Sequence, residues 1–416
     1  MGGQIKTILL GGFLFISFAA SANDSLIFEP IIGGINPHAM VQSTPNADTW
    51  PGWCGVRIQQ QKKLNQSNRS EQTSYYITTD GQRIAGKFEL DTIRASWRSG
   101  ILLSTPIDLE KTLSIGSFTL GQTKQKSKDS VHLVNNDCLD GFVNSIDMTN
   151  GVGIELGDPK ENNDANLKNK ITYIPIHRVA EIRLSTQPKK PTGWRFWLVD
   201  GSILDADSWT DVQNHCRLNK PHVATEMESA STPWTNILGM APNTNTIYPL
   251  TASSWKSIDV DQNPNPRLSP PTITTEFIAT AFDAMPMNIH GPGVFRFATP
   301  MPNCTLATTI HIPPQLIKNI GCRVTITCGA KTLWQSKINS QFKPIYLRLP
   351  ITQGEFTIQL DESTHGAFGC AIQLKDAILI SDTCGNASQP NTPPPTRSGR
   401  DPRSSRGFCQ NGDDEH

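Results

Sequence analysis

The sequence predicts an all-β protein in which a small β-barrel domain is followed by a jelly-roll-type β-sandwich. Apolar and polar residues alternate with a period of two over many short segments, as in half-buried strands. Turn-forming residues are abundant, with 31 Gly and 30 Pro among 416 residues. Stretches with helical periodicity are scarce. Together these features are typical of all-β proteins with many turns.

The first 22 residues have the features of a secretory signal peptide. Lys6 precedes an apolar run from Ile8 to Ala20, and Ala20-Ser21-Ala22 forms an A-x-A cleavage site. The run is too short for a stable transmembrane span, although an uncleaved N-terminal anchor is the alternative. No second long apolar run follows in the sequence. We therefore expect a secreted, periplasmic or cell-surface protein with no membrane span after cleavage.

The remaining chain is long enough for two or three folded units. Residues 23–70 form an N-terminal segment, and residues 71–210 contain the hairpins of the barrel domain. Residues 211–272 are rich in Pro, Asn and Ser, so they are either a connector or the strand-poor front of the next domain. Isolated tryptophans favour the second interpretation. The sandwich is expected over residues 273–385, and the polar tail, residues 386–416, should be disordered.

The charge balance does not favour either of two classes of partner. There are 37 basic and 37 acidic residues, so nothing indicates binding to nucleic acid or to an anionic membrane surface. The nine cysteines include no C-x-x-C pair and no Cys/His group with zinc-finger spacing. We therefore predict no metal site and no cofactor.

The cysteines leave the disulfide pattern open. Because nine is an odd number, at least one cysteine stays unpaired or pairs outside the chain. Cys322 and Cys328 lie on the same side of one predicted strand, about 20 Å apart, and so cannot bridge each other. A set of disulfides and a set of plain buried thiols are both compatible with the sequence.

Three segments repeat one pattern. Each contains an alternating strand, a turn with Asp or Asn, and a second alternating strand, which predicts a β-hairpin. The segments are Tyr75–Glu89, Val131–Asp147 and Arg195–Trp209. The second continues into GVGIEL and ITYIPIHRVAEIRL, giving about five short strands within the length of one small barrel. We interpret the first and third copies as partial repeats that add strands to the same domain.

The second copy resembles an Sm-like barrel. The stretch LVNNDCLDGFVNSID is similar to the first motif of that family, and YIPIHRVAEI is similar to its closing strand, where Pro or Gly precedes an apolar pair. The resemblance covers about Val131 to Leu184 and implies a barrel scaffold. The residues with which the family binds RNA are not recognisable in this sequence.

The C-terminal region has six to eight alternating strands at the spacing of a sandwich. The segments IHGPGVFRF, TLATTIHIP, CRVTITCGAKTLWQS, PIYLRLPI, FTIQLDE and CAIQLKDAIL follow in an order that resembles the NPCBM family of carbohydrate-binding modules. The resemblance covers about Asn288 to Ser381 and implies a sugar-binding sandwich. Of the family's closing motif, Asp376 and Ala377 are retained, whereas Cys370-Ala371 replaces its Asp-His and Leu374 its Trp.

The hairpin from Arg323 to Ile338 is predicted to be a central element of the sandwich with a scaffolding role. Its first strand alternates two sets of residues, so one set should face the core and the other should face outward. The expected inward set is Val324, Ile326 and Cys328, and the expected outward set is Arg323, Thr325 and Thr327.

A sugar site requires an exposed aromatic ring and a few fixed polar groups. Residues of these types near predicted strand ends are Trp334, His290, His365, Tyr346, Asp361 and Glu362, and the family register adds Asp376. Core packing is the alternative for Trp334, because sandwiches commonly bury a Trp. For both histidines, the alternative to a role in sugar binding is an ordinary position in a loop.

An enzymatic function is not predicted. The sequence has no G-x-S-x-G elbow, no H-E-x-x-H and no phosphate loop. Two functions remain. The first is an exported, non-catalytic protein that binds polysaccharide or another glycan through the C-terminal sandwich. The alternative is a structural or interaction component of the periplasm or cell surface, which binds another surface protein and no sugar.

Overall fold

The structure, a computed structural model, covers several separate stretches of the chain. It describes residues 26–32, 53–60, 74–90, 95–117, 127–147, 149–156, 171–223, 227–242, 246–251, 254–256, 271–273, 278–313, 321–362 and 369–382. The expected signal peptide, the expected tail and His365 lie outside these residues.

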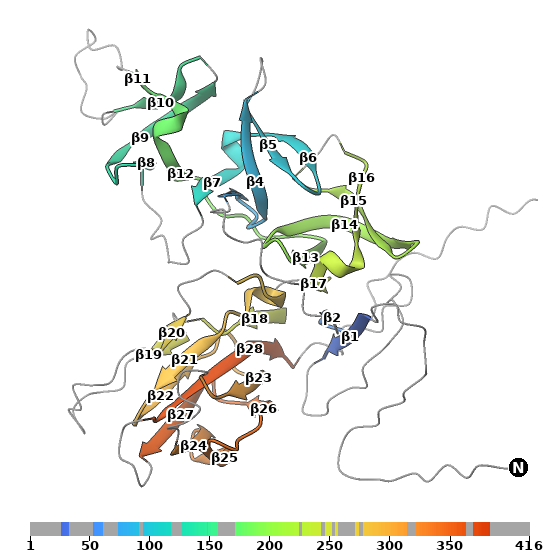
Figure 1. The fold of residues 1–416 in the computed structure, drawn as a ribbon, viewed down its shortest axis with the longest axis vertical. Coiled ribbons are helices and arrows are strands. Elements are labelled where there is room, and N and C mark those ends of the chain that lie inside the picture. The colour runs from blue at the N-terminus through green and yellow to red at the C-terminus, as the bar shows by residue number, and fades with distance from the viewer. Residues whose placement is uncertain are drawn as a thin grey trace, which may run out of the picture.

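The described chain is all-β, as the sequence predicts. Its strands pair antiparallel and form one 17-stranded sheet, a six-stranded sheet and a five-stranded sheet (Figure 1). The large sheet contains β1 to β17, and the two smaller sheets face each other in the C-terminal sandwich. Among the described residues, no helix is both long and apolar enough to span a membrane.

The large sheet contains three five-strand units with the same connectivity. In each unit successive strands pair, a 3-10 turn follows the fourth strand, and the fifth strand pairs with the first, as in small barrels. The first unit comprises β3 (Ser74–Thr78), β4 (Arg83–Leu90), β5 (Ala95–Ser99), β6 (Leu103–Pro106), η3 (Leu109–Lys111) and β7 (Thr112–Ser117). The second comprises β8 (Asp129–Leu133), β9 (Cys138–Asp147), β10 (Gly151–Glu155), β11 (Ile171–Ile174), η4 (Ile176–Arg178) and β12 (Val179–Arg183). The third comprises β13 (Trp194–Leu198), β14 (Ile203–Val212), β15 (His215–Pro221), β16 (Ser229–Pro233), η5 (Trp234–Asn236) and β17 (Ile237–Ala241).

The turn after the first strand is the same in all three units. Its second residue has a positive φ: 79° at Gly81, 70° at Asn136 and 86° at Gly201. Gly and Asn are the residues that adopt this left-handed conformation most readily. The Asp or Asn before it accepts a hydrogen bond from the backbone N–H two residues later, at 2.8–3.4 Å. These side-chain turns explain why D-G and N-N fold each hairpin at the same point.

The closing contact is also repeated. The residue after the first strand donates its backbone N–H to the last carbonyl of the 3-10 turn in every unit. The distances are 2.8 Å for Thr79 to Lys111, 3.0 Å for Val134 to Arg178 and 2.9 Å for Val199 to Asn236. The first and third copies are therefore complete units and not the partial repeats that we interpreted from the sequence. Residues 211–241, which we assigned to a connector or to the next domain, complete the third unit.

The units share a core and a sheet. β12 pairs with β7, and Ile203 of β14 pairs with Arg83 of β4. An N-terminal hairpin of β1 (Leu26–Ile31) and β2 (Gly55–Gln60) adds to β17. Aromatic rings meet edge-to-face in this core, at 5.6 Å between Trp209 and Trp234 and at 5.7 Å between Phe28 and Trp234. Such ring pairs stabilise a fold by more than the burial of their surface alone would.

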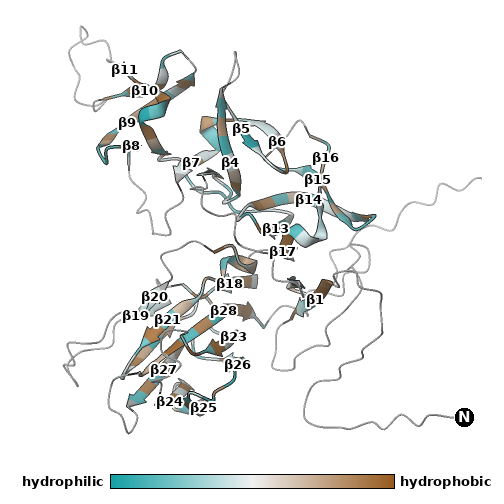
Figure 2. Ribbon diagram, in the orientation of Figure 1, coloured by the Kyte–Doolittle hydropathy of each residue, from teal (hydrophilic) through white to brown (hydrophobic). Residues whose placement is uncertain are grey.

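The sandwich packs a six-stranded sheet on a five-stranded one. The first sheet has β18 (Ile247–Pro249), β20 (Thr272–Ile273), β21 (Met287–His290), β23 (Cys304–His311), β26 (Ile345–Ile351) and β28 (Ala371–Ser381). The second has β19 (Trp255–Lys256), β22 (Gly293–Ala298), β24 (Gly321–Cys328), β25 (Lys331–Asn339) and β27 (Glu355–Glu362). Hydrophobic and hydrophilic residues alternate along these strands (Figure 2). The inner faces form one core.

The predicted hairpin is present as β24 and β25, but it is not central as a whole, because β25 is the edge strand of the five-stranded sheet. Val324 and Ile326 are fully buried, and Cys328 is 4% exposed. Arg323 is exposed and Thr327 is half-buried, as expected for the outer face. Thr325 faces the same way but is buried, because Gln335 covers it and donates a hydrogen bond of 2.9 Å to its hydroxyl.

The barrel region and the sandwich meet at an apolar and charged junction. The short turn η9 (Ala281–Asp283) places Phe282 against Trp197, with ring centroids 4.9 Å apart. Asp283 accepts a hydrogen bond of 2.7 Å from Arg83 of the first unit. On the other side of the junction, the guanidinium of Arg57 donates to the backbone carbonyl of Asp376 at 3.5 Å.

Candidate functional site: a cavity between the first and third units

A cavity of about 980 Å³ lies between the first and third units. One wall is the turn between β3 and β4, and a second wall is the segment around η3. The third unit contributes the residues that follow β15, and the linker before β13 contributes Lys189. The lining residues are Tyr76, Thr78, Thr79, Asp80, Gln82, Ser104, Pro106, Ile107, Asp108, Leu109, Glu110, Lys111, Lys189, His222, Val223 and Met227.

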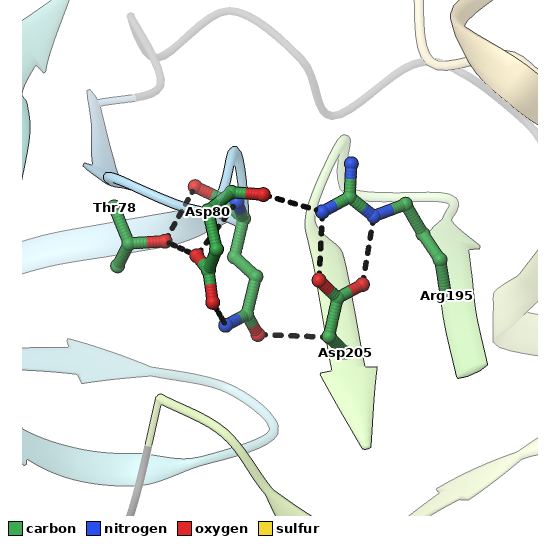
Figure 3. Close-up of polar contacts among 5 residues, drawn as sticks. Thr78, Asp80, Arg195 and Asp205 are labelled. Atoms are coloured by element: carbon green, nitrogen blue, oxygen red, sulfur yellow. Dashed lines mark hydrogen bonds and ion pairs between the residues drawn. The ribbon is translucent and has the colours of Figure 1, made fainter. Parts of the chain in front are cut away.

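A buried ion pair of the third unit, Arg195–Asp205, also connects that unit to the first (Figure 3). Asp205 of β14 is fully buried, and Arg195 of β13 donates one hydrogen bond of 2.7 Å to each of its carboxylate oxygens. Burial raises the pKa of Asp205, and the hydrogen bonds and positive charge of Arg195 oppose that rise. The same guanidinium donates to the backbone carbonyl of Asp80 in the first unit at 2.7 Å. Arg195 therefore fixes the turn of the first unit against the third.

The side chain of Asp80 is held by its own turn. Thr78 donates its hydroxyl proton to one carboxylate oxygen (Figure 3). The Gln82 amide donates to the other oxygen at 2.8 Å. The amide oxygen of Gln82 in turn accepts from the backbone N–H of Asp205 at 2.8 Å. These contacts give the carboxylate of Asp80 one orientation at the cavity wall.

The cavity also offers lysines and an apolar surface. The backbone N–H of Lys189 donates to the Thr79 carbonyl at 2.6 Å, which holds this exposed residue at the cavity. Lys111 lies 3.2 Å from the carboxylate of Asp108, which caps η3. Ile107, Val223 and Met227 are only partly buried and pack on the core of the large sheet. The lining thus combines charged hydrogen-bonding groups with aliphatic side chains.

A metal ion fits this site poorly. Asp80, Asp205 and His222 each bring one potential ligand atom within 4.8 Å of the others. Both carboxylate oxygens of Asp205, however, are bonded to Arg195, so a cation would lie beside a guanidinium. His222 Nε2 lies 2.9 Å from the carboxylate of Asp207. The geometry favours an ion-pair network that fixes the two units together.

The residues proposed from the sequence lie at separate places. Trp334 is half-buried on β25, where it pairs with Ile326 and so faces the inner side of the sandwich. His290 is exposed at the end of β21, in the opposite sheet. The structure does not bring these two side chains into one described site.

Tyr346 and Asp376 both lie near Arg57. Both lie near enough to act electrostatically on this buried guanidinium, which also pairs with Glu29 at 3.1 Å. Burial raises the pKa of the Tyr346 phenol, which accepts a hydrogen bond from Arg348 at 3.3 Å. The two residues therefore belong to the junction between the N-terminal hairpin and the sandwich.

The sequence interpretation missed the cavity residues. Asp80 lies in the turn that is repeated in all three units, and this repeat was the sequence signal that could have pointed to it. The position of His222 had no local signal, because its approach to Asp80 depends on the packing of two units.

Comparisons with known proteins find solved structures that are distantly similar to this chain. No family model matches the sequence, and no curated protein matches it. Tandem CBM51 modules of a family 98 glycoside hydrolase from Streptococcus pneumoniae are similar over 71% of this chain and 88% of that chain, with 9% identity and a TM-score of 0.23.

Two further solved structures come from Clostridium perfringens. A CBM51 from GH95 in complex with methyl-galactose is similar over 26% of this chain and 74% of that chain, with 7% identity and a TM-score of 0.22. CBM51-2 with the INT domains of ZmpB, in complex with GlcNAc, is similar over 44% of this chain and 42% of that chain, with 11% identity and a TM-score of 0.25. Similarity at this level assigns no ligand to the present chain.

Proposed function

We propose that this is an exported, non-catalytic carbohydrate-binding protein and that the cavity between the first and third units is its binding site. The observation that carries the proposal is the lining of the cavity, where oriented carboxylates and lysines lie beside aliphatic side chains. A pyranose presents the matching pattern, because it has a ring of hydroxyl groups and apolar C–H faces.

The size and chemistry of the cavity support this class of ligand. Small-molecule sites typically enclose about 300–1,000 Å³, and the cavity lies at the upper end of that range. Hydroxyl groups of a sugar would donate to Asp80 and Glu110 and accept from Lys189, while C–H groups would pack on Val223 and Met227. The rigid turn that holds Asp80 lowers the entropic cost of ordering the site on binding.

The sandwich is the second candidate surface for the same ligand class. Its support is the order of its sequence segments, which resembles the NPCBM pattern, and the partial exposure of Trp334. The inward direction of Trp334 makes this surface the weaker candidate. In this proposal the sandwich is mainly a scaffold.

A glycan array with the full chain, followed by calorimetric titration of the best glycan, tests the proposal. We expect Lys189→Ala and Glu110→Gln to weaken binding at least tenfold, whereas the matched control Lys190→Ala, outside the cavity lining, should bind as the wild type does. Loss of binding in Trp334→Ala alone would transfer the site to the sandwich. Absence of binding to any glycan would refute the proposal.

One observation favours the alternative, an interaction component. Among the described residues, four of the five most exposed large hydrophobic side chains belong to the second unit or directly follow one of its strands. They are Val134, Leu156, Ile171 and Tyr173, with exposures of 62%, 43%, 37% and 48%. If these side chains bind a second copy of the chain, sedimentation of the full chain would show self-association. Tyr173→Ser and Ile171→Ser would then abolish it. A monomer at all concentrations would count against it.

A further inference from the structure

Two buried cysteines from opposite sheets of the sandwich are in contact. Cys322 lies on β24 of the five-stranded sheet, and Cys370 directly precedes β28 of the six-stranded sheet. They are 4% and 3% exposed, and both carry thiols in this structure. The Cys370 side chain lies close enough to Cys322 to stabilise its thiolate. The two sulfur atoms are therefore neighbours although the residues are far apart in the sequence.

The backbone on each side fixes this approach. Gly321, just before Cys322, donates its N–H to the carbonyl of Gly369, just before Cys370, at 3.4 Å. On its other side, Cys370 accepts a hydrogen bond of 2.7 Å from the N–H of Gly291. The side chain of Cys370 also approaches the carbonyl of Asp361 at 3.6 Å. These contacts hold the segments that carry Cys322 and Cys370 side by side.

We propose that Cys322 and Cys370 form a disulfide that links the two sheets of the sandwich, and that a small-molecule or protein disulfide is the oxidant. The sequence left a disulfide set and plain thiols equally open. The contact between these two residues now selects one pair.

The reaction balances as two thiol–disulfide exchanges. The Cys322 thiolate attacks one sulfur of the oxidant and forms a mixed disulfide, and the other sulfur of the oxidant leaves as a thiolate. The Cys370 thiolate then attacks the Cys322 sulfur and expels the second half of the oxidant. The two protein thiols lose two protons and two electrons, and the oxidant is reduced to two thiols. Because both residues are buried in the folded domain, the exchange takes place as the sandwich folds.

Local hydrogen bonds distinguish the Cys322 thiol once the sandwich is folded. Hydrogen bonds from Cys370 and from the Ala371 N–H lower the pKa of the Cys322 thiol, because they stabilise its thiolate. A neighbouring pair behaves differently. Burial raises the pKa of Cys304 to about 11, and Cys328 lies 3.8 Å from the hydroxyl of Thr352. Cys328 is therefore a matched control, since it is buried on the same strand but does not contact Cys370.

Peptide mapping of the full chain tests the proposal. The protein is refolded from denaturant in a mixture of oxidised and reduced glutathione, alkylated, digested without reduction and analysed by mass spectrometry. We expect a cross-linked peptide that contains Cys322 and Cys370, lost in Cys322→Ser and retained in Cys328→Ser. Complete alkylation of both residues in the refolded wild type would overturn the proposal, and so would a bond from either residue to another cysteine.

The melting temperature gives a second readout. It is compared with and without reductant in each protein, so the stabilities of the two proteins need not be equal. Reductant should lower the melting temperature of the wild type more than that of Cys322→Ser. Comparison with this variant is needed because Cys54 is disulfide-bonded and responds to reductant in both proteins. Equal shifts in the two proteins would contradict the cross-link.

Discussion

Removing Arg195 should destabilise the large sheet strongly, because it leaves the carboxylate of Asp205 buried without a counter-charge. Arg195→Met keeps much of the side-chain length but removes both hydrogen bonds of 2.7 Å to Asp205, which is fully buried. Breaking one partner of a buried pair costs about 3–5 kcal/mol. The bond to the Asp80 carbonyl is lost as well, so we expect the upper part of that range.

Urea denaturation gives the assay, with the free energy of unfolding obtained by linear extrapolation. An exposed pair provides the control: Arg98 and Glu89 are 2.9 Å apart, but their side chains are 67% and 41% exposed. Arg98→Met should leave the urea midpoint nearly unchanged, because exposed ion pairs contribute little. A loss below about 1 kcal/mol in Arg195→Met would refute the reasoning, since Asp205 would then find other partners or water.

The pH dependence of this variant has a defined sign. Burial raises the folded-state pKa of Asp205, and removing Arg195 raises it further. A folded state that binds the proton more tightly loses stability as the pH rises from the unfolded pKa through the folded pKa. The destabilisation by Arg195→Met should therefore be smaller at about pH 4, near the ordinary pKa of Asp, than at neutral pH. An equal loss at both values would contradict a buried, ionised Asp205.

Three further substitutions test the packing. Gly86→Ala should lower the melting temperature sharply, because a Cβ there would lie 2.1 Å from the Arg98 carbonyl, whereas Gly100→Ala, with no atom within 4 Å, should be tolerated. Equal effects would argue against this close approach of β4 to Arg98. Ile326→Ala should reduce the free energy of unfolding of the sandwich by about 2–5 kcal/mol, since the residue is fully buried, and a negligible change in urea denaturation would contradict that core. Trp334→Ala should also lower the melting temperature, because the ring packs on the same core; glycan binding lost at unchanged melting temperature would instead make this residue part of a sugar site.

Local signals were sufficient for the all-β class and for the hairpins. The turns at Asp80-Gly81 and Asp200-Gly201 and the alternation around Ile326 act within a few residues, so the sequence carries them directly. The later strands of the first and third units were not predictable. LSTP in β6 and SASTP in β16 have little apolar alternation, and they are strands because the unit closes around them.

The candidate site was predictable only in part. Residue types suited to sugars led to the sandwich, but the cavity is lined by the Asp80 turn and the η3 segment of the first unit, by residues after β15 of the third unit and by Lys189. Its position depends on Arg195, which joins the Asp80 turn to Asp205. No periodicity or motif in the sequence encodes such a contact, because it arises only when the units pack.

Hydrogen–deuterium exchange of the full chain, with and without the best glycan of the array, tests the proposed site most directly. Bound glycan should slow amide exchange in Thr78–Gln82, in Ile107–Lys111 and around His222, the segments that line the cavity. Exchange in β24 and β25 should stay unchanged. Slower exchange confined to the sandwich, or no change in any segment despite binding, would contradict the site.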